Sequence, residues 1–385
     1  MGMRAAFAVG ALALAGAIAV AATDPLPVED SSIVHASIAL DVGEIEAYLG
    51  ESPPNYAAAK ELYSNGKNSP KGSGMRTLQG MAQKDLSAEP LATGFVTLYG
   101  ATDFLDTYMV AALDGTGDFA GMSDDVRTVA AKKNMQAILV LYANHEAVEA
   151  LEQAELGVAL NAPKESGSNN IYYDEYYAFW YGLTGENAPA EVTRKRDLDF
   201  GTDVLGEAFA SFAAGREAAL AADVAGIEAA QEEISAGFLK TFLQATLKYS
   251  YKVQAGTGDD GDWAEGYTYW RVVSGIVAAE NLEAAQAIDA LLWPAPSRAD
   301  LHPRMYCKIK SHIEAALPIK GVTYADLGEL TQDHGKGIVI SADACPLPVA
   351  ADEEEEEEAD SPASRAQVSL LGAALVGVAS VALML

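Results

Sequence analysis

Carboxylates and tyrosines occur together in two short segments of this chain, residues 172–180 and 262–270. The acids of the two segments are Asp174, Glu175, Asp262 and Glu265. Glu265 lies one helical turn before Tyr269, on an apolar stripe that continues to Ile276. A buried carboxylate must be paired, protonated or bound to a cation, because burying a bare charge is costly. Carboxylate and phenolate oxygens are hard ligands, so these segments suit Fe(III), Ca²⁺ or Mn²⁺.

The same residues also fit a purely structural role. Asp262 followed three residues later by Glu265 is the pattern of a helix capping box. The neighbouring tyrosines would then be core aromatics. The sequence leaves both interpretations open, a cation site and a capped, packed helix.

A third candidate is the pair His145 and Glu149, which are one helical turn apart on the stripe of Ile138 and Tyr142. An inward-facing His and Glu can ligate a metal in the core of a helical bundle. A histidine with satisfied hydrogen bonds in the core is the alternative. Glu146 lies beside them, on the next stripe of the helix.

Common enzyme signatures are absent from the sequence, which contains no HExxH, GxSxG or GxxxxGK[ST] motif. The GxGxxG spacing of residues 256–261 follows a predicted helix, whereas a Rossmann site requires a strand before it. We therefore expect a protein that is not an enzyme. A metal-dependent hydrolase with Glu149 or Glu265 as its base remains an alternative, since only a structure shows whether a pocket surrounds them.

The two acidic, aromatic segments align with each other. Glu175 corresponds to Glu265 and Trp180 to Trp270, and each segment follows a polar loop that contains glycine. Such an internal match predicts two related helical halves, residues 23–195 and 196–350.

Helical spacing of apolar residues dominates the body of the chain and predicts an all-α fold of antiparallel helical bundles. The clearest helix begins at Ser123 and runs to about Glu155. Residues 23–37 are expected to be irregular, and residues 337–341 to form a strand. The other principal helices are expected at residues 41–50, 55–64, 94–113, 171–182, 200–221, 224–251, 263–292, 302–316 and 324–330.

The charge of the chain is strongly negative, with 55 acidic and 25 basic residues and a formal net charge of −30. Nucleic-acid binding requires clusters of Lys and Arg, so this class of partner is excluded. The charge suits cations or basic partners, and solubility alone is the simpler explanation.

Both ends of the chain carry targeting signals. Residues 1–22 combine Arg4, an apolar run and small residues, as in a secretory signal peptide. Residues 367–385 are apolar and are expected to be a GPI-attachment signal or a single anchoring helix. Between this tail and the body, residues 351–366 contain the run Glu353–Glu358, which predicts an acidic disordered stalk. We expect an exported protein held at a membrane.

The two cysteines, Cys307 and Cys345, lie in the exported part of the chain. An oxidising compartment makes a disulfide between them the expected state.

Two further segments, YSNGKNS at residues 63–69 and MRTLQG at residues 75–80, together with the two aromatic helices, resemble the algal low-iron-inducible periplasmic proteins. The resemblance implies a non-enzymatic protein that binds iron at the cell surface and supports its uptake. It implies iron ions as cargo and a membrane iron transporter or reductase as partner. The ligands would be Glu175 and Glu265 first, with tyrosines and His145 assisting. Binding should weaken as pH falls, because the ligands must be deprotonated. The alternative is a structural or adhesive surface protein.

Overall fold

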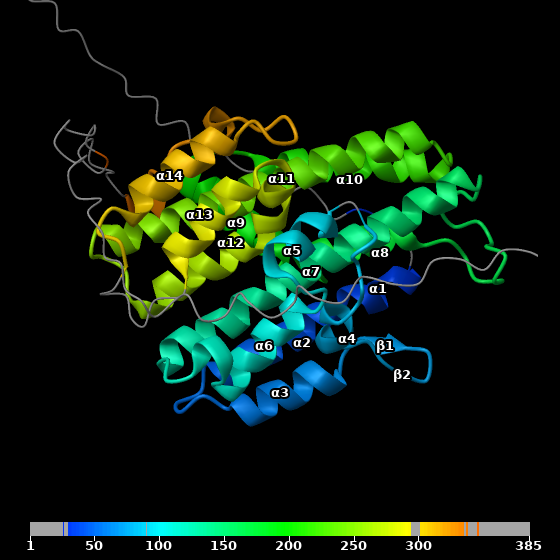
Figure 1. Cartoon of the computed structure of the whole chain (residues 1–385). Coiled ribbons are helices and arrows are strands. Elements are labelled where there is room, and N and C mark those ends of the chain that lie inside the picture. The colour runs from blue at the N-terminus through cyan, green and yellow to red at the C-terminus, as the bar shows by residue number, and fades with distance from the viewer. Residues whose placement is uncertain are drawn as a thin grey trace, which may run out of the picture. The chain divides into compact units, whose positions relative to one another are not determined.

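The computed structural model describes Leu26 and residues 30–89, 91–293, 301–334, 336–337 and 345. Helices make up most of the described chain, so the predicted all-α fold is confirmed (Figure 1). The chain divides into a body, residues 1–344, and a C-terminal unit, residues 345–385, of which only Cys345 is described. The two related halves stay a prediction.

Fourteen α-helices are described, and their bounds follow in chain order. They are α1 (Asp30–Ala36), α2 (Ile38–Leu49), α3 (Tyr56–Asn65), α4 (Leu78–Ala82), α5 (Ala92–Tyr99), α6 (Phe104–Asp114), α7 (Asp124–Glu155), α8 (Tyr172–Tyr181), α9 (Pro189–Phe200), α10 (Val204–Leu220), α11 (Val224–Gln254), α12 (Asp260–Glu280), α13 (Leu282–Leu292) and α14 (Met305–Ala316). Short 3-10 helices cover Gly117–Phe119 and Tyr324–Leu327.

The described strands form two small antiparallel hairpins. One pairs β1 (Pro70–Lys71) with β2 (Gly74–Met75), and the other pairs β3 (Gln332–Asp333) with β4 (Lys336–Gly337). The second hairpin overlaps the strand predicted at residues 337–341 at Gly337 only, because the residues that follow lie outside the described part of the chain.

Helix α7 is the central element of the body (Figure 1). Ser123 caps its start, since the Ser123 hydroxyl accepts a hydrogen bond from the Val126 backbone N–H at 3.3 Å. Asp124 and Asp125 in the first turn interact favourably with the helix dipole. The helix is 32 residues long and packs against α8, α12, α6, α4 and α2. It therefore contacts both aromatic segments at different levels along its axis.

Two differences from the predicted helices have local causes, and a third is the presence of α1. Gly100, at φ 70°, ends α5 and splits the helix predicted at 94–113. Asn281 splits the one predicted at 263–292, since its side chain caps α13 by accepting from the Ala284 N–H at 3.0 Å. Residues 23–37 were expected to be irregular, yet α1 lies within them and carries His35.

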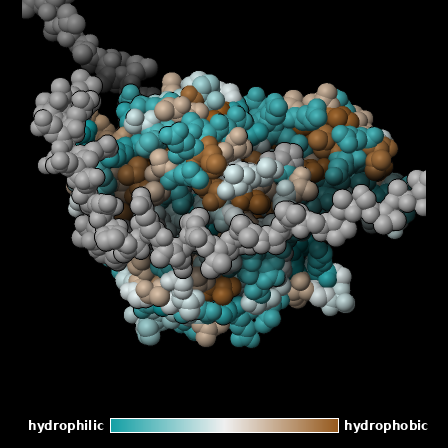
Figure 2. All heavy atoms as spheres, viewed as in Figure 1, coloured by the Kyte–Doolittle hydropathy of each residue, from teal (hydrophilic) through white to brown (hydrophobic). Residues whose placement is uncertain are grey.

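Apolar side chains gather between the helices, and the face seen in Figure 2 is mostly hydrophilic, with hydrophobic residues in small separate groups. Helices α5 and α12 approach most closely at Gly94 and Gly275, where the Phe95 ring lies directly against Gly275.

This close approach gives a first prediction. Gly275→Ala places a methyl group inside the Phe95 ring, so we expect the free energy of unfolding to fall by about 1–3 kcal/mol. Gly237→Ala is the matched control in α11, because its new methyl group would lie 3.4 Å from Val204, an ordinary contact. The control should be neutral or stabilising by up to about 1 kcal/mol. Urea unfolding of both variants measures the difference, and equal stabilities would contradict the described packing.

Candidate functional site

Helix α8 has one face toward α10 and another toward α7 and α1. Tyr176 packs on Phe212 of α10, with ring centroids 4.8 Å apart. Glu175 and Phe179, one turn apart, share the other face. There the Phe179 ring meets His35 of α1 edge to face at 5.8 Å. The aromatic packing of α8 thus directs Glu175 into the space between α1 and α7.

Three ionisable side chains meet in this space. The His35 Nε2 atom lies 2.9 Å from the Glu175 Oε1 atom. Glu146 of α7 is hydrogen-bonded to Glu175. All three are buried, and Glu146 is only 4% exposed. We call Glu146, Glu175 and His35 the carboxyl cluster.

The pKa values of the two carboxyl groups shift in opposite directions. Burial raises the pKa of Glu146 well above its ordinary value, and the negative charge of Glu175 adds to the effect. Burial also acts to raise the pKa of Glu175, but hydrogen bonds from His35 and Glu146 outweigh it and lower this pKa. Glu146 therefore donates its proton to the Glu175 carboxylate.

Arg76 and Tyr142 border the carboxyl cluster. The Arg76 Nη1 atom donates to the Ser69 hydroxyl at 2.9 Å, and its guanidinium carbon lies 5.5 Å from the Phe179 ring centroid. Burial lowers the pKa of Arg76, although the charge of Glu175 opposes this effect. Burial raises the pKa of Tyr142, and the charge of Glu175 adds to the effect. Arg76 and Ser69 belong to the two segments MRTLQG and YSNGKNS, so these segments help to build the site.

His145 and Glu149 of α7 lie beside the carboxyl cluster. The His145 Nδ1 atom is 2.6 Å from Glu89 Oε1, and its Nε2 atom is 3.8 Å from Glu149 Oε1. The His145 ring also contacts Tyr142 edge to face, with centroids 5.5 Å apart. His145 is thus held between two carboxylates at the border of the cluster.

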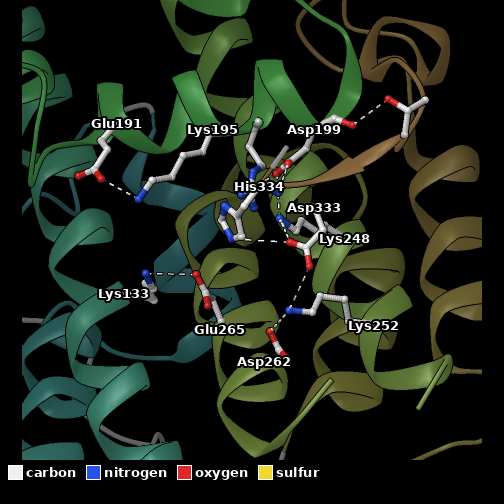
Figure 3. Close-up of polar contacts among 12 residues, drawn as sticks. Lys133, Glu191, Lys195, Asp199, Lys248, Lys252, Asp262, Glu265, Asp333 and His334 are labelled. Carbon is white, nitrogen blue, oxygen red and sulfur yellow. Dashed lines mark hydrogen bonds and ion pairs between the residues drawn. The ribbon is translucent and has the colours of Figure 1, made fainter. Parts of the chain in front are cut away.

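Glu265 lies at a different level of α7 and has a different partner. The Lys133 Nζ atom is 3.1 Å from Glu265 Oε1, and Figure 3 shows the two side chains pointing toward each other. Burial acts to raise the pKa of Glu265, but the charge of Lys133 and a hydrogen bond from Tyr249 lower it. Lys133 and Glu146 are separated by roughly 20 Å along the helix axis, at 1.5 Å per residue. Glu175 and Glu265 therefore belong to separate clusters.

The remaining predicted ligands, Asp174 and Asp262, are each paired with a cation. Asp174 accepts two hydrogen bonds from Arg216, at 2.7 and 3.3 Å. Asp262 lies 2.5 Å from Lys252 Nζ and forms a capping box with Asp259. The box predicted at residues 262 and 265 thus lies three residues earlier, because α12 begins at Asp260.

In the described part of the chain, no group of three or more His, Cys, Asp or Glu side chains is arranged so that it could hold a metal ion. Sequence reasoning missed His35, which lies outside every predicted helix, and Arg76. It placed Glu146 on a stripe next to His145 without assigning it a role.

The predicted disulfide is confirmed, since both Cys307 and Cys345 are disulfide-bonded. Within the described residues, no helix has the length and apolar character that crossing a membrane requires. The predicted signal peptide (1–22), stalk (351–366) and apolar tail (367–385) fall outside the described residues.

Comparison with known proteins gives one family. A model of the low iron-inducible periplasmic proteins matches residues 3–254, a range that contains the whole carboxyl cluster and ends before Glu265. No curated protein and no solved structure matches the chain. The chain belongs to the family of low iron-inducible periplasmic proteins.

Proposed function

We propose that this protein binds iron outside the cytosol in support of iron assimilation, without enzymatic activity, and that the carboxyl cluster holds the ion. The observation that carries the proposal is the buried pair Glu146 and Glu175, hydrogen-bonded across two helices beside His35. The family to which the chain belongs supports iron as the cargo.

A purely structural role explains this cluster poorly. Buried ionisable groups contribute little net stability, because desolvation offsets their attraction, and well-packed apolar residues of similar volume often serve as well. Three such groups, Glu146, Glu175 and His35, come from three different helices and meet in one buried place. Buried constellations of this kind are characteristic of functional sites.

The donor set fits iron. Loss of the Glu146 proton leaves two carboxylates, which together with the His35 imidazole provide oxygen and nitrogen ligands projecting from facing helices. Tyr142 adds a phenol oxygen at the border, where Fe(III) favours such hard donors. The positive charge of Arg76 offsets part of the negative charge that the deprotonated cluster would carry.

The proposal extends to the location and partners of the protein. The predicted signal peptide exports the chain, and residues 367–385 attach it to a membrane, either as a signal that is exchanged for a GPI anchor or as a single helix. Iron bound near the membrane would pass to a transporter or reductase there.

An iron titration tests the proposed function. The chain from Thr23 onward is titrated with Fe(II), and with Fe(III) presented by a weak chelator, and calorimetry follows binding. We expect saturable binding that releases protons, because the ion displaces the proton that Glu146 donates to Glu175. X-ray absorption at the iron edge should show oxygen neighbours and one imidazole.

The acidic run provides the control. Changing Glu353–Glu358 to glutamine removes six carboxylates without touching the cluster, and it should leave the tight binding unchanged. Absence of saturable binding, or its loss in this control, would overturn the proposal in favour of a surface protein with loosely attracted cations.

A further inference from the structure

The surroundings of Glu265 repeat a pattern seen around Glu175. Each glutamate lies in an aromatic helix, α8 or α12, at positions that align in the sequence. Each faces a buried arginine, Arg76 or Arg196. In the described structure, the Nε atom of both arginines has no hydrogen-bond partner.

The long helix that precedes each aromatic segment contributes a tyrosine. Tyr142 of α7 borders Glu175, and Tyr249 of α11 donates a hydrogen bond to Glu265. Tyr269 is a further phenol beside Glu265. A carboxylate, phenol oxygens and a guanidinium are thus present at both places.

The surroundings of Glu175 and Glu265 differ in the groups that compensate the negative charge of the glutamate. Glu175 is compensated by His35, whose Nε2 atom is 2.9 Å away, and by a hydrogen bond from Glu146. Glu265 is compensated by the ammonium group of Lys133, 3.1 Å away. The Lys133 side chain is 24% exposed, and its Nζ atom lies 5.7 Å from the Tyr269 ring centroid. The ammonium therefore lies where the carboxylate and the phenols converge.

We propose that Glu265, Tyr249 and Tyr269 form a latent cation site and that the ammonium group of Lys133 occupies it as a built-in counter-ion. Each chain therefore carries one iron ion, the one in the carboxyl cluster. The number of one iron ion per chain rests on the proposed function of the carboxyl cluster, whereas the inference of the latent site does not. Its ligands are hard oxygen donors, so it would take a trivalent or divalent hard cation.

Charge explains why the lysine closes this site. An incoming cation would lie at contact distance from the ammonium, and repulsion between like charges at that distance is strong in a partly buried setting. Replacing Lys133 by methionine keeps most of the side-chain volume and removes the charge. We expect affinity for a hard cation at this place to rise at least about a hundredfold.

Terbium luminescence tests the inference, because Tb³⁺ prefers oxygen ligands and is sensitised by nearby tyrosines. The full mature chain and its Lys133→Met variant are titrated with Tb³⁺. The wild type should bind one Tb³⁺ ion tightly per chain, and the Lys133→Met variant should bind two. The matched control is Lys132→Met, which removes the same charge from the adjacent residue of α7 and should stay at one. Adding Glu265→Gln to Lys133→Met should return the count to one.

Two further variants separate the possible failures. In a Glu175→Gln background the carboxyl cluster is disabled, and Lys133→Met should still gain one ion. If the wild type binds none and Lys133→Met binds one, the proposed function fails and the latent site stands. An unchanged count in Lys133→Met overturns the latent site alone. The single variant Glu265→Gln, in which Lys133 is intact, should still bind one Tb³⁺ ion per chain. If Glu265→Gln binds one ion fewer than the wild type, Glu265 is already a ligand in the wild type, and the inference is overturned.

Discussion

Replacing Glu146 by glutamine is expected to preserve the fold and to weaken iron binding at least about a hundredfold. The glutamine amide can donate an N–H to Glu175 in place of the carboxyl O–H, so the buried hydrogen bond persists. It cannot become a carboxylate, so one ligand is lost. Even changes in residues that only orient metal ligands cost about 10–100-fold in affinity, and loss of a ligand should cost more. Unfolding in urea should differ from the wild type by about 1 kcal/mol or less.

This variant separates a ligand from a structural group. Glu152→Gln is the control, since Glu152 is an exposed residue of the same helix, and its iron affinity should equal that of the wild type. Competition with a chelator of known affinity measures the iron affinity of the wild type, Glu146→Gln and Glu152→Gln. A stable Glu146→Gln variant with unchanged iron affinity would show that the carboxyl cluster is a structural hydrogen bond only.

Replacing Asp199 by asparagine is expected to lower the free energy of unfolding by about 3–5 kcal/mol. Asp199 is fully buried and lies 2.8 Å from Arg196 Nη2 and 2.9 Å from Lys248 Nζ. Its carboxylate also accepts the His334 N–H at 3.0 Å, which holds the β3–β4 segment against α9 and α11. Figure 3 shows Asp199, Lys248 and Asp333 in one chain of contacts. Asparagine keeps the shape and removes the charge, leaving two buried cations with one fewer counter-ion.

The control for this prediction is Asp203→Asn. Asp203 is exposed and its side chain makes no capping hydrogen bond at the start of α10, so the cost should stay within about 0.5 kcal/mol. Urea unfolding compares the variants. Equal stability of Asp199→Asn and Asp203→Asn would show that Asp199 does not anchor this network.

The sequence predicts most of the helices because their signals are local. The start of α7 follows from Ser123 and the acids after it, and its length follows from the apolar spacing. Breaks that depend on one residue, at Gly100 and Asn281, interrupt patterns that otherwise continue, so periodicity alone does not reveal them. Helix α1 is only seven residues long, too short for a periodic pattern to stand out.

The candidate site could be predicted only in part, for a related reason. Glu175 is recognisable as an acid among aromatic residues, and Glu265 looks equivalent by the same criterion. Their different partners, Glu146 with His35 and Lys133, lie in helices remote in sequence, and only tertiary packing brings them together. The sequence therefore ranked the two glutamates equally, whereas the structure pairs Glu175 with a carboxyl group and an imidazole, and Glu265 with an ammonium group.

The most direct test of the account is a crystal structure of the iron-loaded protein with anomalous scattering recorded at the iron edge. The account predicts one strong anomalous peak per chain, in contact with Glu146, Glu175 and His35, and none at Glu265. A peak at another set of residues, or no ordered peak in crystals of protein saturated with iron, would contradict it.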